Sequence, residues 1–327
     1  MLAAFDFDRD FAFDFDCVGA GVLARPSRAQ RQSFTQVIQS TVLVLECHPH
    51  APENYSRPAI LHWVTGPMMA RPRALGILLV ATAALIAVAF LLPRIPQPAA
   101  YHNFAHHRAW LGIPNFLDVV SNLPFAIAGL VGLAFLARRD SAARFHDSRE
   151  RWPYAVVFAG LLLTAFGSAY YHRAPDNARL VWDRLPMAVT FMALVAAVVT
   201  ERISVRAGLW LLPVLVGIGV WSVFAWYASE LRGAGDLRTY AFIQAYGVVV
   251  LPLVLVLFPL PYTRTLDLLG AVGWYALAKL LETFDHAVYS LGQVIGGHAL
   301  KHIAAALAGW WIVQMVRKRE IMGAGGE

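Results

Sequence analysis

Three histidines, one aspartate and one serine have the types and spacing of a metal-dependent hydrolytic site. Ser168 and His172 are four residues apart, so on a helix they share one face. His298 and His302 form a second pair with the same spacing. Asp183 lies eleven residues after His172, beyond a short polar link. Together they suggest a metal site with one open coordination position.

Each residue type fits one part of that chemistry. The three imidazoles are predicted to bind Zn²⁺ and to leave a fourth position for water, as catalytic zinc sites do. Zinc lowers the pKa of such a water to about 7, which makes it a nucleophile at neutral pH. We expect Asp183 to take the proton of this water, or to orient a histidine. Ser168 is expected to donate a hydrogen bond to the water or to a developing oxyanion.

The composition places these residues in a membrane protein. Of the 327 residues, 58% are hydrophobic and 15% are charged, whereas ordinary globular chains carry about a quarter charged residues. Long apolar runs recur along the chain, which predicts an all-α polytopic fold. Cys17 and Cys47 both precede these runs, so a thiolate metal site is excluded there. No basic, aromatic-rich surface stretch indicates a nucleic-acid partner, and the expected partner is the lipid bilayer.

Eight membrane-spanning helices are predicted, many with a proline near one end. Their ranges are 75–93, 117–137, 154–172, 180–200, 207–227, 240–258, 265–285 and 297–316. Residues 69–100 hold the first helix, 101–316 the other seven as one domain, and 317–327 a cytoplasmic tail. Residues 1–68 show no sustained period and are expected to be a poorly structured extension. A start codon assigned too early, with translation beginning at Met68 or Met69, would explain them.

The basic residues predict the orientation of these helices. Arginines and lysines gather before the first helix, between the second and third, and after the last; they are Arg71, Arg73, Arg138, Arg139, Arg144, Arg149, Arg151, Arg317, Lys318 and Arg319. Eight spans put these regions on one side, which is cytoplasmic by the positive-inside rule. We therefore expect both termini in the cytoplasm, the five candidate site residues in the outer half of the membrane, and a bacterial inner-membrane location.

Several of these motifs resemble the alkaline ceramidase family. The similar segments are GSAYYH with Asp183 after it, HxxxH in the last span, and NFLDVVSN at residues 115–122. The family belongs to a superfamily of seven-helix membrane hydrolases that includes the adiponectin receptors. The resemblance covers residues 101–316 and implies a seven-helix core, here preceded by one extra span. It also implies zinc on His172, His298 and His302, catalytic roles for Ser168 and Asp183, and hydrolysis of the amide bond of a ceramide-like lipid.

The segment 101–118, which leads into the first helix of the seven-helix domain, departs from that family. Animal members carry a calcium site rich in acidic residues there, whereas Asp118 is the only carboxylate here and Asn115 stands where an acidic ligand is expected. Calcium takes about six to eight oxygen ligands, so its retention is disfavoured. His102, His106 and His107 suggest either a second metal cluster or, with better support, interfacial residues.

Two charged residues lie near the end of the apolar 265–285 span. Lys279 and Glu282 are three residues apart and are expected to pair within a pocket wall rather than to act directly in catalysis.

Other functions fit parts of the same pattern. The same zinc site could hydrolyse an amide or ester in another lipid. A receptor or transporter could use the histidines as a ligand or proton site, although a transporter predicts discontinuous helices in paired halves, which the sequence lacks. Ser168 and Asp183 discriminate between an enzyme and a receptor, because a purely structural zinc requires neither.

Overall fold

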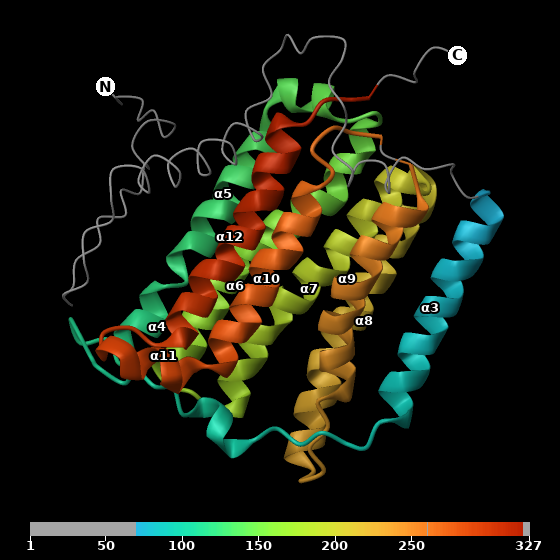
Figure 1. The fold of residues 1–327 in the computed structure, drawn as a ribbon. Helices are drawn as coiled ribbons and strands as arrows, with labels where there is room; N and C mark the ends of the chain where they lie inside the picture. Colours follow the sequence, from blue (N-terminus) through green and yellow to red (C-terminus); the bar gives the residue numbers. More distant parts are fainter. Residues whose placement is uncertain (1–69, 260, 323–327) are drawn as a thin grey trace, which may run out of the picture. The chain divides into compact units, whose positions relative to one another are not determined.

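The computed structural model describes residues 70–259 and 261–322, and in this part of the chain the regular elements are helices (Figure 1). The longer helices are α3 (Arg71–Leu91), α5 (Leu123–Ala137), α6 (Arg151–Arg173), α7 (Asn177–Arg202), α8 (Val205–Leu231), α9 (Arg238–Leu257), α10 (Asp267–Thr283) and α12 (Gly297–Lys318). Short elements join them: η1 (Ala99–His102), α4 (Phe116–Val120), η2 (Arg139–Arg144), η3 (Ser148–Glu150) and α11 (Asp285–Gly292). The all-α prediction is confirmed. The predicted extension 1–68 lies outside the described residues.

Among the described residues, seven helices are long and apolar enough to cross a membrane. Their ranges are Arg71–Leu91, Phe116–Ala137, Ser148–Arg173, Asn177–Arg202, Val205–Leu231, Arg238–Leu257 and Gly297–Lys318. The protein is therefore an integral membrane protein. The remaining predicted span, 265–285, corresponds to α10, which has 17 residues and is shorter than these seven. The predicted helix 117–137 is divided into α4 and α5 by a break at Ser121 and Asn122.

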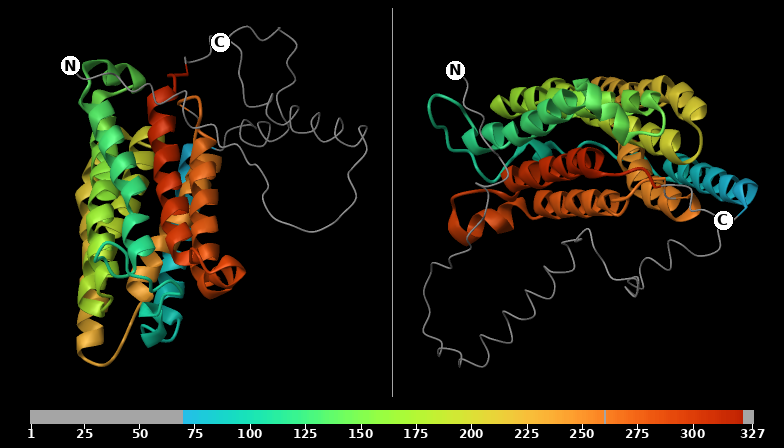
Figure 2. Two further views of the ribbon diagram at one scale, coloured as in Figure 1. Left: turned by 90° about the vertical axis from the view of Figure 1, so that its left-hand side faces the viewer. Right: turned by 90° about the horizontal axis from the view of Figure 1, so that it is seen from above.

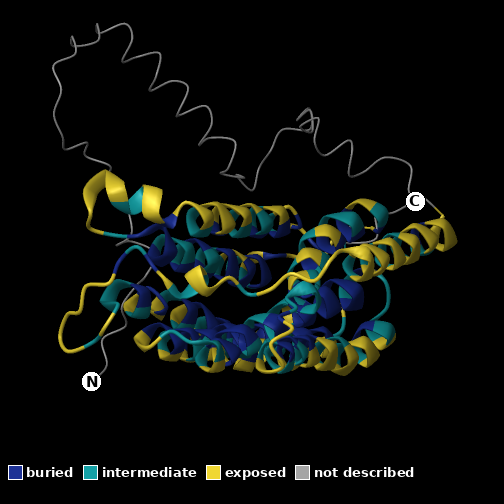
Figure 3. Ribbon diagram, turned by 90° about the horizontal axis from the view of Figure 1, so that it is seen from below, coloured by how far each residue is buried: buried dark blue, intermediate teal, exposed yellow. Residues whose placement is uncertain are grey.

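The helix α7 is the most buried of the spanning helices and packs against α6, α8 and α9. On the other side of the site, α12 lies between α10 and α5 (Figure 2). Most of α3 is exposed and is drawn largely in yellow in Figure 3, and its packing partner is α9. Apolar side chains on such a surface contact lipid rather than water, so this exposure fits a peripheral membrane helix.

Small residues let the helices around the site approach closely. A Cβ atom at Gly167 of α6 would lie 2.0 Å from the backbone oxygen of Trp182 in α7. A Cβ atom at Gly297 would lie 2.3 Å from the backbone oxygen of Leu281, where α12 meets α10. Close backbone approach through small residues is the usual mode of helix packing in membranes. These two contacts bring α6 to α7 and α12 to α10 at the end of the bundle that carries the predicted site.

Side-chain caps fix where the site helices begin. Asp176 precedes α7 and accepts a hydrogen bond from the backbone N–H of Arg179 at 2.7 Å. Asp285 accepts one from the backbone N–H of His298 at 2.9 Å, and another from that of Ala105 at 2.8 Å. Such caps satisfy N–H groups that a helix leaves free in its first turn. Asp285 thus fixes both the start of α12 and the segment that precedes α4.

The basic segments lie together at the opposite end of the helices. Arg144 of η2 donates to the backbone oxygen of Arg319 at 2.8 Å, and Arg71 of α3 donates to that of Ile203 just after α7. Arg319 is buried, forms an ion pair with Glu201, and lies with its guanidinium 3.9 Å from the ring centroid of Tyr262. The prediction that these regions share one side is confirmed, whereas the side of the membrane on which they lie stays a prediction.

Candidate metal centre

His172, His298 and His302 form one buried cluster in which the candidate ligand nitrogens all lie within 4.8 Å of one another. His172 belongs to the last turn of α6, and the other two belong to the first two turns of α12. All three are at most 4% exposed. The predicted convergence of two sequence segments 126 residues apart is therefore confirmed.

Polar and aromatic contacts fix the orientation of these rings. Ser121 lies with its hydroxyl 2.8 Å from Nδ1 of His302, which leaves Nε2 of that ring as the ligand atom. Asn115 donates from its side chain to the backbone oxygen of His172 at 2.9 Å. The ring of Phe104 covers His172 and His298, with centroid distances of 4.7 and 4.3 Å. The apolar cover on one side restricts the access of water to the cluster.

The donor set fits a tetrahedral zinc ion. The Nε2 atoms of His172 and His298 are 3.4 Å apart. Two nitrogens bound at 2.0–2.1 Å to a tetrahedral ion are about 3.3 Å from each other. Nδ1 of His172 is buried without a hydrogen-bond partner among the described residues. Three neutral imidazoles suit zinc and other transition metals better than calcium or magnesium, so the cluster is compatible with zinc.

Lys301 is part of the site, although no sequence motif pointed to it. Its Nζ atom is 2.9 Å from Nε2 of His298 and 2.9 Å from a carboxylate oxygen of Glu282. Glu282 also pairs with Lys279, as predicted, and accepts a hydrogen bond from the hydroxyl of Tyr101 at 3.3 Å. Burial and the nearby Glu282 carboxylate raise the pKa of Tyr101 well above its usual range, so its hydroxyl stays a neutral donor.

Ser168 and Asp183 lie side by side in the same region. Ser168 is one turn before His172 on α6, Asp183 is in the second turn of α7, and both are buried. The close contact of Gly167 with α7 places the two side chains next to each other. Both residues line a cavity that is also lined by His302. The structure thus brings all five predicted site residues to one end of the bundle.

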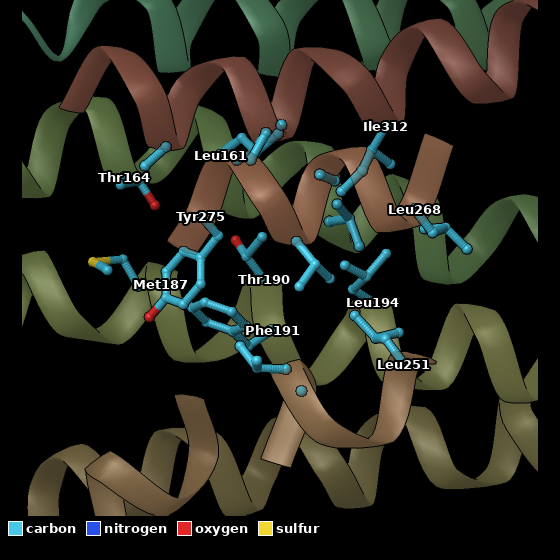
Figure 4. A pocket seen from close by; sticks show the side chains of 18 of the residues that line it. Leu161, Thr164, Met187, Thr190, Phe191, Leu194, Leu251, Leu268, Tyr275 and Ile312 are labelled. Atoms are coloured by element: carbon cyan, nitrogen blue, oxygen red, sulfur yellow. The ribbon is translucent and has the colours of Figure 1, made fainter. Parts of the chain in front are cut away.

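A second, apolar cavity adjoins the polar one. The two share five lining residues, namely Phe125, Thr164, Met187, Tyr275 and Ala305. Figure 4 shows Thr164, Met187 and Tyr275 toward one end of the apolar cavity, and Leu194, Leu251 and Ile312 toward the other. On α12 the lining residues of the two cavities run from Lys301 and His302 to Ile312. A rise of 1.5 Å per residue makes the path from His302 to Ile312 about 15 Å long.

The three upstream histidines have separate surroundings. His102 contacts Tyr171 through Nδ1 at 2.8 Å and Asn177 through Nε2 at 2.9 Å, so both its ring nitrogens are occupied. His106 is buried against the ring of Tyr289, and burial lowers its pKa. His107 is exposed. In the range 70–322, apart from residue 260, the cluster of three histidines is the only group of at least three histidine, cysteine or carboxylate side chains close enough together to share a metal ion.

The segment 101–118, compared above with a calcium site, contributes no residue to a cluster of histidine and carboxylate ligands among the described residues. The side chain of Asn115 donates to His172, and the residue adopts a left-handed conformation with φ of 48°. Asp118 is completely buried, and neither of its carboxylate oxygens has a partner in the described part of the chain. One carboxylate falls well short of the six to eight oxygens that calcium takes.

Comparison with known proteins adds no identification, since no family model and no curated protein matches the chain.

Proposed function

We propose that this protein is an intramembrane zinc-dependent hydrolase that cleaves the amide bond of a ceramide-like N-acyl lipid. The observation that supports the proposal most directly is the shared wall of the two cavities. Ser168, Asp183 and His302 line the polar one, and the apolar one leads from it between the helices. An amphipathic substrate has the same division into a polar group to be cleaved and an apolar chain.

Each residue of the site would have a separate role in the reaction. His172, His298 and His302 hold the zinc ion, which when bound supplies a Lewis acid and lowers the pKa of water. Asp183 accepts a proton from the attacking water, and later donates it to the leaving amine. Ser168 donates a hydrogen bond to the negative charge that develops on the amide carbonyl oxygen. The surrounding helices exclude bulk water, which strengthens each of these interactions.

The apolar cavity would hold the acyl chain. Its walls come from α5, α6, α7, α9, α10 and α12, and nearly all of its lining is aliphatic or aromatic. A chain that lies along α12 from His302 places its amide at the polar end and its methyl end near Ile312. Burial of the apolar chain supplies a large part of the binding free energy and holds the scissile bond at the polar end.

The assignment to the alkaline ceramidase family is part of the same proposal. It is supported by the sequence motifs and by the cluster that α6 and α12 form. The cluster alone is also compatible with a related lipid amide or ester substrate. A location is part of the proposal as well. The basic segments lie at the end of the helices opposite the cluster, which under the positive-inside rule favours the outer half of the membrane for the cluster, and the proposed membrane is a bacterial inner membrane.

A substrate panel tests the proposal. Purified protein is incubated with N-acyl and O-acyl lipids of equal chain length, with and without a chelator, and products are measured by mass spectrometry. We expect chelator-sensitive release of fatty acid from N-acyl lipids, and none from the His172→Ala variant. His107→Ala, at an exposed histidine outside the cluster, serves as the control and is expected to retain activity. Zinc in the parent protein without hydrolysis of any lipid in the panel would favour a receptor-like function.

A further inference from the structure

Arg184 is a buried cation without a carboxylate partner in the wall of the polar cavity. The residue is 4% exposed and follows Asp183 directly on α7. Its Nη2 donates to the side-chain oxygen of Gln97 at 2.7 Å, whereas Nη1 is buried and has no partner among the described residues. A buried guanidinium is costly unless its charge and its N–H groups are satisfied.

Aromatic rings satisfy only part of this requirement. The guanidinium carbon lies 4.0 Å from the ring centroid of Trp226 and 4.7 Å from that of Tyr240. Such contacts stabilise the positive charge and hold the side chain in place, but they give Nη1 no oxygen or nitrogen acceptor. Glu230 makes no direct contact with the guanidinium: it accepts hydrogen bonds from the backbone N–H of Gln97 at 3.3 Å and from the indole N–H of Trp226 at 3.2 Å. The side chain is thus fixed in position with one donor unused.

The other cations of the cavity are already paired. Lys279 and Lys301 both contact Glu282, one on each of its oxygens. Arg184 is the cationic residue of this lining for which no ion pair is found in the described part of the chain. With Asp183 as the second carboxylate, three cationic and two acidic side chains line the cavity. The lining therefore has one more cationic than acidic side chain, and Arg184 is the cation of the three without an ion pair among the described residues.

We propose that Arg184 binds an oxyanion, a carboxylate or a phosphate, in the head group of the lipid that occupies the cavity. The inference rests on the proposed function and makes its substrate class narrower: an N-acyl lipid with an acidic head group. Arg184 lines the polar cavity and not the apolar one that would hold the acyl chain, so the anion lies on the head-group side of the scissile amide. A guanidinium suits this role because its N–H groups match the geometry of a carboxylate or phosphate.

A matched pair of ligands tests the inference through binding. N-oleoylglycine and N-oleoylethanolamine share the acyl amide and differ in a carboxylate against a hydroxymethyl group. Affinities for the full chain in detergent are measured, with hydrolysis followed in parallel. We expect the parent protein to bind the acidic lipid at least about tenfold more tightly. Equal affinity of the parent for these two lipids, together with equal affinity for the phosphate pair described below, would overturn the inference.

Variants of two arginines on α7 show whether the preference comes from Arg184. Arg184→Gln is expected to bind the two lipids with nearly equal affinity, and Arg184→Lys to keep a smaller preference. Arg179→Gln, which breaks the ion pair with Asp176 on the same helix, should retain the parental ratio. A preference that survives in Arg184→Gln would exclude Arg184 as its source. If Arg184→Gln does not fold, the comparison of Arg184→Lys with the parent decides the question, since an unchanged ratio contradicts the inference.

Further ligands separate the possible anions. Ceramide 1-phosphate compared with ceramide tests a phosphate in place of the carboxylate, and a preference for either acidic lipid supports the inference. Inorganic phosphate is added as a competitor. Displacement of the acidic lipid by millimolar phosphate would show a site for a free anion and overturn the assignment to a lipid. A preserved preference without hydrolysis would leave the anion site in place and contradict only the hydrolase function.

Discussion

The Nζ atom of Lys301 lies 2.9 Å from Nε2 of His298, the ring nitrogen that faces His172. An ammonium group at this distance donates to the same lone pair that a metal ion requires. Glu282 contacts the same ammonium at 2.9 Å from the neighbouring helix α10. The carboxylate therefore gives Lys301 another partner and makes the lone pair of His298 accessible to a metal.

The first prediction concerns Glu282. Replacing it by Gln removes the charge that holds Lys301, so the ammonium should compete more strongly for His298. We expect zinc affinity to fall by about tenfold or more, measured by titration against a chelator. Asp267→Asn is the control, because this carboxylate belongs to the first turn of α10 and pairs with Arg264, which is exposed. Parental zinc affinity in Glu282→Gln would show that Lys301 does not compete for the site.

The second prediction concerns the hydroxyl of Ser121, which orients His302. Ser121→Ala leaves Nδ1 of this buried ring without its partner, so the ring loses both its orientation and its preferred tautomer. Zinc affinity is expected to fall by about 10- to 100-fold. Ser141→Ala provides a matched control: Ser141 is also buried, but it donates to Leu136 and Arg138. If both variants bind zinc as the parent does, Ser121 has no part in the metal centre.

The third prediction concerns the contact between α6 and α7. An added methyl group at Gly167 cannot fit, because its carbon would lie 2.0 Å from the backbone oxygen of Trp182. Gly167→Ala should push the helices apart and lower stability by about 1–3 kcal/mol, and it should lower activity as well because Ser168 moves away from Asp183.

Gly273→Ala on α10 is the control for this prediction, since no atom lies within 4 Å of the Cβ position there. Thermal unfolding in detergent compares the two variants with the parent. A Gly167→Ala variant as stable and as active as Gly273→Ala would disprove the requirement for close packing at this position.

Most of the fold was predictable because hydropathy alone determines where membrane helices lie. The predicted span 180–200 and the observed α7, Asn177–Arg202, differ by two or three residues at each end. The break between α4 and α5 was not predicted, since the sequence stays apolar on both sides of Ser121 and Asn122. The helix can be interrupted there because the side chain of Asn122 donates a hydrogen bond to the backbone oxygen of Asp118 at 2.7 Å, which satisfies a carbonyl group at the break.

The cluster was predictable because its residues occur in short motifs: Ser168 and His172 are four residues apart, and so are His298 and His302. Lys301 and Ser121 were not, for a different reason. Lys301 contacts Glu282 across 19 residues, and Ser121 contacts His302 across 181, so both roles depend on how separate helices pack. The proposed role of Arg184 likewise depends on its contact with Trp226 and on its place in the cavity wall, and its neighbours in sequence do not indicate it.

The last prediction separates metal binding from chemistry. Asp183→Asn keeps the shape of the side chain but removes the base, so zinc should remain while turnover falls by about 100-fold or more. His302→Ala removes a ligand and should lose both zinc and activity. Ser168→Ala should keep zinc and lose about 2–4 kcal/mol of transition-state stabilisation, which is the usual contribution of one oxyanion donor.

Zinc content by elemental analysis and turnover on the best N-acyl lipid are measured for all three variants. The order of the effects is decisive, more than their size. Parental turnover in Asp183→Asn would exclude this residue as the base and favour a receptor-like metal site. Loss of zinc in the same variant would instead make Asp183 a ligand or an essential support of one. The carboxylate that activates water would then have to be another residue of the cavity, and Glu282, which also lines it, is the next to test.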